Sequence, residues 1–110
     1  MPRFAVETAE SFDNDLDAAV SWRLANVGPS SAARLLNAYD ALVAVIGEFP
    51  LMAGSVEGAS YRWRTLEGYV AVYAIDEAAR IVTLMRLFHM STDWRAHLLA
   101  SDADEQHGGM

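Results

Sequence analysis

The hydrophobic residues of this chain follow a helical spacing in its first half and a strand-like spacing in its second half, which limits the folds open to it. Before Pro50 the apolar residues recur every three or four positions. From Tyr61 onward they alternate with polar residues or form short continuous runs. With 110 residues, the chain has room for a single modest core. We therefore expect one domain in which helices are followed by strands.

Two amphipathic helices are predicted before Pro50. Thr8 is positioned to cap the first, which should end at Gly28, and Ser30 is positioned to cap the second. Pro50 should end the second helix, because proline lacks the backbone N–H that a helix interior needs. The apolar stripes consist of Phe12, Leu16, Ala19, Val20, Leu24 and Val27 in the first helix and Leu35, Tyr39, Leu42, Ile46 and Phe49 in the second.

Four strands are predicted around these helices: Phe4–Val6, Tyr61–Leu66, Tyr69–Ile75 and Ile81–Phe88. The last three are close enough along the chain to form an antiparallel meander with tight turns. The segment Leu51–Ala59 is predicted to be a loop because it contains two glycines. A short final helix, capped by Ser91 or Thr92, should hold Trp94, Leu98 and Leu99.

Neither helix can bury its apolar stripe alone, whereas packing both on one face of a sheet buries the two stripes together. The predicted fold class is therefore α+β in two layers: an N-terminal strand and a helical hairpin packed on an antiparallel sheet, in the order β-α-α-β-β-β, with a short C-terminal helix. The first strand should join the sheet beside a later strand. The predicted domain spans residues 1–100, and residues 101–110 are predicted to form a disordered tail.

The charge of the chain restricts its partners. The net charge of −7 argues against general binding to polyanions such as nucleic acids. The charge is uneven, since residues 61–97 hold five arginines against four acidic residues while the rest of the chain is acidic. The absence of cysteine excludes disulfides and thiolate metal sites. No apolar run is long enough for a membrane span or a signal peptide, so we expect a cytoplasmic protein that does not bind membranes.

Three stretches follow one another in a specific order: GPSSAARLLNAYDALVAVIGEFP, YRWRTLEGYVAVYAID and IVTLMRLFHMSTDW. They resemble the second helix, the arginine–tyrosine hairpin and the strand ending in His-x-x-x-Asp of the RelE/ParE superfamily, the bacterial toxins of type II toxin–antitoxin pairs. The resemblance covers roughly residues 4–99. It implies a toxin that is neutralised by a cognate antitoxin protein. Such a toxin is expected to form either a homodimer or a hetero-oligomer with the antitoxin.

The superfamily has two branches that differ in activity. RelE-like members cleave messenger RNA on the ribosome, whereas ParE-like members share the fold and inhibit DNA gyrase. In RelE-like chains an arginine typically follows a glycine–aromatic step, but here Gly68 and Tyr69 are followed by Val70, and the chain has no lysine. Valine can neither donate a hydrogen bond to a scissile phosphate nor stabilise its developing charge. The resemblance therefore favours a ParE-like toxin that arrests growth by binding gyrase.

Two alternatives stay open. The chain could be a ribosome-dependent endoribonuclease, with Arg62, Arg64 and Arg86 as its cations and His89 or Tyr69 as the acid or base. It could also be an interaction module that has lost its toxicity. The sequence indicates no cofactor for any of the three functions.

The favoured functional surface is a patch formed by Arg62, Arg64 and Arg86. Arg62 and Arg64 share one strand face, and Arg86 should align with them from a neighbouring strand. Such a patch could hold phosphates or the carboxylates of an acidic partner. The same arginines could instead lie in solvent or pair with Glu67 or Asp76.

Three tryptophans extend this predicted surface. Trp63 and Trp94 could stack on a partner, or they could pack in the core. Trp22 lies off the apolar stripe of its helix, beside an arginine. We therefore expect Trp22 to be exposed and to contact a partner.

His89 is the histidine closest to the predicted patch. It could act as a base, or it could hold the strand end through a bond to Asp93. His89, Asp93 and His97 are spaced in steps of four, as in some metal sites. Because His89 belongs to the strand, only two of the three would share a helix face, and no metal site is predicted.

Overall fold

The computed structural model describes residues 3–52, 54–56 and 60–98 of the chain. Its elements are β1 (Ala5–Thr8), α1 (Glu10–Asn26), α2 (Pro29–Glu48), β2 (Gly54–Ser55), β3 (Arg62–Leu66), β4 (Tyr69–Asp76) and β5 (Ile81–His89). One five-stranded sheet joins the strands in the order β1-β5-β4-β3-β2. β1 runs parallel to β5, and the other neighbours are antiparallel. Residues 94–98 form a helical turn after β5.

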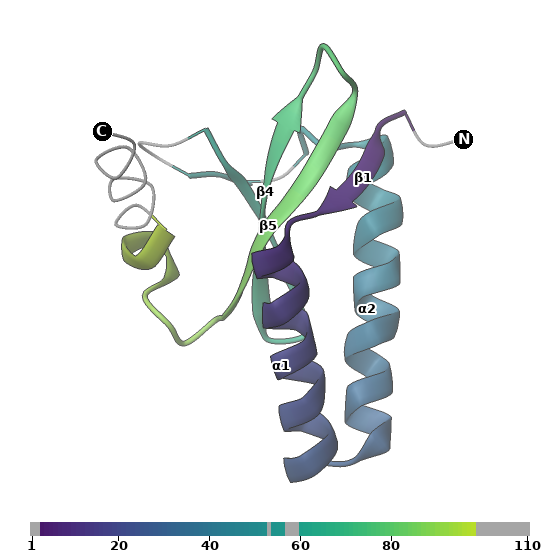
Figure 1. Ribbon diagram of the computed structural model, residues 1–110, viewed down its shortest axis with the longest axis vertical. Coiled ribbons are helices and arrows are strands. Elements are labelled where there is room, and N and C mark those ends of the chain that lie inside the picture. The colour runs from purple at the N-terminus through teal and green to yellow at the C-terminus, as the bar shows by residue number, and fades with distance from the viewer. Residues whose placement is uncertain (1–2, 53, 57–59, 99–110) are drawn as a thin grey trace.

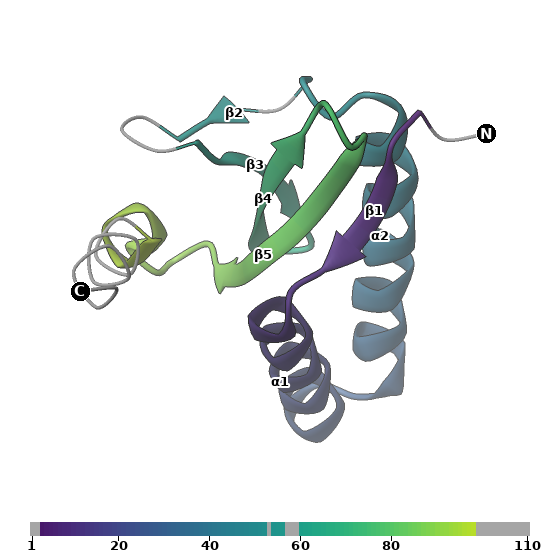
Figure 2. The same cartoon turned by 45° about the horizontal axis from the view of Figure 1, so that its top comes forward.

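The two long helices pack on one face of the sheet, and the helical turn at residues 94–98 packs on the other (Figures 1 and 2). The predicted α+β class is confirmed, including a first strand that joins beside a later one; the sheet is mixed because this strand runs parallel to its neighbour. No helix in the described part of the chain is long and apolar enough to cross a membrane. The predicted tail, residues 101–110, and Leu99 of the final helix lie outside the described residues.

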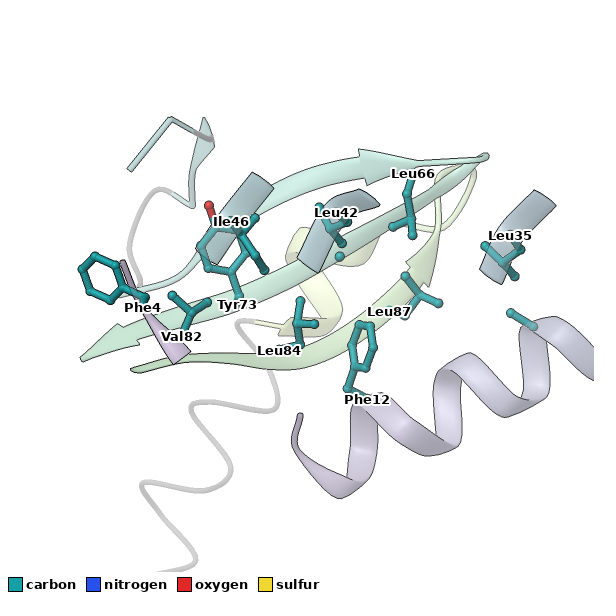
Figure 3. Packing of buried hydrophobic residues seen from close by; sticks show 12 residues of the cluster. Phe4, Phe12, Leu35, Leu42, Ile46, Leu66, Tyr73, Val82, Leu84 and Leu87 are labelled. Atoms are coloured by element: carbon teal, nitrogen blue, oxygen red, sulfur yellow. The ribbon is translucent and has the colours of Figure 1, made fainter. Parts of the chain in front are cut away.

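The main core lies between the helices and the sheet (Figure 3). α1 contributes the fully buried Phe12, and α2 contributes Leu35, Leu42 and Ile46 from its predicted stripe. Burying a side chain of this size stabilises the fold by about 1.5–3 kcal/mol. The sheet residues that complete this cluster are Leu66, Ala71, Tyr73, Val82, Leu84 and Leu87.

The helical hairpin extends beyond the sheet, and its far end leaves apolar residues exposed (Figure 1). Leu24 is 55% exposed and Val27 is 62% exposed, although both continue the stripe of α1. At the other end of the hairpin, Phe49 is 51% exposed. The helical spacing therefore predicts the helices correctly and the buried length of their stripes incorrectly, because spacing does not say where the sheet ends.

Both predicted helix caps are wrong. Thr8 belongs to β1, and Ala9 takes the cap position of α1 without a side-chain hydrogen bond. α2 begins at Pro29 rather than after Ser30. Gly28 takes the cap position with a φ of 135°, a conformation that favours glycine, and proline suits the first turn of a helix.

The predicted loop at Leu51–Ala59 contains a short strand. Gly54 and Ser55 form β2, which pairs with Trp63 and Arg62 of β3. A Cβ atom at position 54 would lie 2.5 Å from the Trp63 side chain, so glycine is required for this approach. Position 53 and residues 57–59 lie outside the described residues.

Side chains of α1 complete the edge of β5 where β1 ends. β1 pairs with β5 only as far as Leu84, so the next backbone groups of β5 need other partners. Ser11 Oγ donates to the carbonyl of Met85 at 2.6 Å. The N–H of Leu87 donates to Asp15 Oδ2 at 2.9 Å. α1 therefore takes the place of a neighbouring strand at this edge.

Tyr73 joins the sheet to the segment that follows α2. It is fully buried, and its hydroxyl donates to the carbonyl of Pro50 at 2.5 Å. Burial raises the pKa of the Tyr73 hydroxyl above its ordinary value, against the opposing effect of nearby Arg64 and Arg62.

Replacing Tyr73 by phenylalanine should change how stability depends on pH. Because the folded-state pKa is raised, the stability linked to the Tyr73 proton is complete below the unfolded value of about 10 and is lost as the pH rises through the folded pKa. We expect Tyr73→Phe to cost about 1 kcal/mol at neutral pH, since the carbonyl of Pro50 loses its donor. Above about pH 10 the variant should lose less stability than the wild type. Urea unfolding across this range measures both effects, and equal losses in the two proteins would contradict the prediction.

Candidate functional site

The arginines of the predicted patch lie on two different faces of the sheet. Arg62 and Arg64 of β3 face the helices, since Leu66 on the same side of the strand lies in the main core. Arg62 Nη1 donates to the carbonyl of Leu51 at 3.2 Å. Arg64 lines a pocket of about 240 Å³ beside α2. Within the part of the chain that the structure describes, no hydrogen bond or ion pair joins Arg64 to another residue.

Arg86 projects from the opposite face, so the predicted patch of three arginines does not form. β5 contains a bulge at Met85, which has no partner in β4. Without this extra residue, Arg86 would follow Leu84 onto the side that faces the helices. The bulge instead aligns Arg86 with Val72 and, one strand further, with Trp63.

The guanidinium of Arg86 is held by Asp15 of α1. Nε donates to Oδ2 at 2.7 Å and Nη2 donates to Oδ1 at 3.4 Å. The group also lies over the ring of Phe88, 4.8 Å from its centroid. Because the same carboxylate accepts the N–H of Leu87, it fixes both the Arg86 side chain and the backbone of β5. A cation neutralised in this way is poorly placed to bind a phosphate as well.

Three other predicted residues, Trp22, Tyr69 and His89, line one pocket of about 370 Å³ between α1 and the ends of β4 and β5. The predicted exposure of Trp22 is confirmed at 58%. The guanidinium of Arg23 lies 5.4 Å from the centroid of the Tyr69 ring. The centroids of the Tyr69 and His89 rings are also 5.4 Å apart, and the two ring planes meet edge to face at 80°. The remaining residues of this hollow, which we call the Trp22 pocket, are Asp15, Ala18, Ala19 and Leu87.

Ser91 determines how His89 presents its ring. The backbone N–H of Ser91 donates to His89 Nδ1 at 3.2 Å, and Ser91 Oγ lies 2.6 Å from the same nitrogen. In the neutral ring Nδ1 is therefore the acceptor, and Nε2 carries the hydrogen. The neutral ring of His89 thus presents a donor at Nε2, and its partner is Ser91 rather than the predicted Asp93. No group of three histidine and acidic side chains lies together among the described residues.

The face of the sheet away from the helices carries a second apolar cluster. Val70, at the start of β4, is only 2% exposed within it. Trp94 is buried in the same cluster, and Trp63 packs against it, so both tryptophans take the core alternative. The other members are Val56, Val72, Phe88, Leu98 and the partly buried Tyr61.

Arg95 covers this second cluster, although the sequence did not single it out. Its guanidinium lies 4.2 Å from the ring centroid of Trp94 and 5.3 Å from that of Trp63. The two indole rings are themselves 5.7 Å apart. The one available signal was its position directly after a tryptophan in the arginine-rich part of the chain.

Residues 6–94 of the sequence match the family model described as the ParE toxin of the type II toxin–antitoxin system parDE. The chain belongs to the ParE toxin family. Among curated proteins, none matches the sequence.

Solved toxin structures share the fold of this ParE-family chain. A chain of the chromosomal ParDE system from P. aeruginosa matches with a TM-score of 0.68 and 17% identity, covering 81% of this chain and 98% of that one. A chain of the RelBE2 toxin–antitoxin complex from Mycobacterium tuberculosis matches with a TM-score of 0.55 and 20% identity, covering 81% of this chain and 99% of that one. The isolated E. coli RelE toxin matches with a TM-score of 0.53 and 17% identity, covering 94% of this chain and 97% of that one. At these identities the likeness establishes the fold alone.

A second arginine that the sequence did not single out positions the Trp22 pocket of this ParE-family chain. Arg23 donates to the backbone carbonyl of Glu67 and forms an ion pair with its side chain at 3.4 Å. Glu67 was one predicted partner of Arg62 or Arg64, but Arg23 holds it instead. Since Arg23 also lies over Tyr69, it ties the β3–β4 turn and the pocket wall to α1.

Proposed function

We propose that this chain is the toxin of a type II toxin–antitoxin pair that binds DNA gyrase in the bacterial cytoplasm and so arrests growth. The environment of Val70 supports binding over RNA cleavage most directly. In the position where RNA-cleaving relatives typically carry an arginine, this chain has an apolar side chain, 2% exposed, packed with Phe88 and Trp94. A covered valine can neither reach nor stabilise a phosphate in a transition state.

The other residues predicted to take part in RNA cleavage also favour binding. Asp15 neutralises Arg86, and Arg62 and Arg64 lie on the opposite face of the sheet from Arg86. His89 uses its acceptor nitrogen for Ser91 and presents a donor. A general base and a cation are therefore not directed at one point, which in-line cleavage of RNA requires.

We assign the Trp22 pocket to the target. An exposed tryptophan beside a pocket is typical of the few residues that dominate the energy of a protein interface. Trp22 forms the exposed wall, and Tyr69 and His89 line the hollow behind it. A protein partner would insert a large apolar side chain beside Trp22 and accept a hydrogen bond from His89 Nε2.

Trp22→Ala should raise the toxin concentration that half-inhibits supercoiling by purified gyrase at least about tenfold, because the exposed wall of the pocket is lost. Leu24→Ala is the matched control, since Leu24 is 55% exposed on the same helix and does not line the pocket. The control should inhibit like the wild type. Equal potency of all three proteins would remove the pocket from the proposal.

A second assay separates the candidate functions. Primer extension on a translated message should show intact transcripts in the presence of the protein. Cleavage at defined codon positions would overturn gyrase binding in favour of an endoribonuclease. Strong expression without growth arrest, antitoxin absent, would favour an interaction module.

We further propose that the cognate antitoxin lies along the free edge of β3. β2 pairs only with Arg62 and Trp63, so within the described residues Arg64–Leu66 has no strand on its outer side. Beside this edge is the pocket of about 240 Å³ that α2 lines with Ala38, Ala41, Leu42 and Val45. An extended segment can add to such an edge, with an acidic side chain toward Arg64.

The gene next to this one is expected to encode the antitoxin, so its product can be used to test this contact. That protein should suppress growth arrest and co-purify with the wild-type chain. Arg64→Glu should weaken this capture, while Arg34→Glu, exposed on α2, should not. Equal capture of both variants would place the antitoxin elsewhere.

A further inference from the structure

A separate hollow lies at the end of the molecule opposite the tip of the helical hairpin. It lies where the start of β1, the end of α2 and the β4–β5 turn come together (Figure 1). Its volume is about 460 Å³, and it shares no residue with the Trp22 pocket. Three exposed apolar residues come from the segment after α2: Phe49 is 51% exposed, Leu51 is 54% exposed and Met52 is 72% exposed. Large apolar side chains gathered in this way mark an interaction surface.

Charged side chains of both signs line the same hollow as these apolar residues. They are Arg3, Arg80, Glu48 and Glu77. Arg80 is held in place, since its guanidinium lies 4.9 Å from the ring centroid of Phe4 and its Nε donates to the carbonyl of Arg3 at 3.0 Å. Among the described residues, none of the four charged groups has an ion-pair partner. The hollow therefore offers both halves of a charge pair without joining them.

We propose that this end of the molecule is the contact between two copies of the chain. In a two-fold dimer the same patch faces itself, so a surface that carries both signs around an apolar centre is complementary to its own copy. Phe49, Leu51 and Met52 of the two copies pack together. Arg80 of each copy then meets Glu48 of the other, at two symmetric positions. A partner of one charge would leave half of these groups opposed to a like charge.

The contact leaves the Trp22 pocket free, because that pocket lies between α1 and the far ends of β4 and β5. It also leaves the outer edge of β3 beyond Trp63 open. The dimer does not depend on the identity of the target or of the antitoxin.

Sedimentation velocity over a range of protein concentrations tests the contact. The wild type should pass from monomer to dimer, and Met52→Asp should raise the dissociation constant at least about tenfold. Leu24→Asp introduces the same charge at an exposed apolar site on the distant hairpin tip and should dimerise like the wild type. A wild type that stays monomeric at all concentrations, or a Met52→Asp variant that dimerises normally, would overturn the proposal.

Charge reversal tests the pairing itself. In Arg80→Glu the new carboxylate at position 80 of one copy meets Glu48 of the other. In Glu48→Arg the new guanidinium at position 48 meets Arg80. Because like charges then face each other, each variant alone should be monomeric. An equimolar mixture should form a heterodimer, because each reversed charge then meets its opposite. Recovery in the mixture also shows that both variants are folded. A mixture that stays monomeric while the separate variants are folded by circular dichroism would overturn the pairing.

Discussion

Arginine in place of Val70 should destabilise the fold by about 3–5 kcal/mol, because it buries an uncompensated charge. Val70 is 2% exposed in the second cluster, where Phe88 and Trp94 are its apolar neighbours and Arg95 brings a like charge. The longer side chain does not fit beside Phe88 and Trp94, so we expect it to displace the helical turn at residues 94–98 from the sheet. We therefore expect both a loss of stability in urea unfolding and a rise in tryptophan exposure to quenchers.

Thr65→Arg is the matched control for this substitution. Thr65 pairs with Val70 across the β3–β4 ladder, so its side chain lies on the same face, yet it is exposed. The same charge at this neighbouring position should change stability by no more than about 0.5 kcal/mol. Neither variant should cleave translated message, since His89 and Arg86 stay committed to Ser91 and Asp15. A stable Val70→Arg protein that cleaves transcripts would show that a single side chain separates the two activities, contrary to our proposal.

The helices and strands could be predicted from the sequence because each has a repeating pattern. Leu35, Leu42 and Ile46 follow the helical spacing of α2 and are all buried as predicted. The alternation in β3 likewise separates Trp63 from the two arginines beside it, and the structure places them on opposite faces. Patterns of this kind record which side of an element meets the core.

The separation of Arg86 from Arg62 and Arg64 could not be predicted, because it depends on one residue that breaks a pattern. Counting by twos along β5 puts Arg86 on the side of Leu84, but the bulge at Met85 reverses the faces after it. The bulge lies where β1 ends and α1 begins to supply partners to the β5 edge. That circumstance is set by tertiary packing and leaves no local signal in the sequence. The Trp22 pocket has a similar origin, since its walls come from segments far apart in the chain.

Removing the carboxylate of Asp15 should cost about 2–4 kcal/mol, because one side chain serves both a cation and a backbone donor. In Asp15→Ala the N–H of Leu87, next to the buried core, loses its acceptor, and Arg86 loses its ion pair. We discount the ion-pair part, since the Arg86 side chain is 36% exposed and the Asp15 side chain 21%. Asp17→Ala, at an exposed position on the same helix, is the control and should cost no more than about 0.5 kcal/mol.

Asp15→Asn separates the two roles of the carboxylate. The amide oxygen can still accept the N–H of Leu87, while the charge that holds Arg86 is gone, so this variant should lose about half as much stability as Asp15→Ala. Urea unfolding of the three variants gives the comparison. Equal losses for Asp15→Asn and Asp15→Ala would mean that the ion pair alone matters and that α1 does not replace a strand at the β5 edge. A graded loss would support that replacement, which links the helical hairpin to the bulge that turns Arg86 away from Arg62 and Arg64.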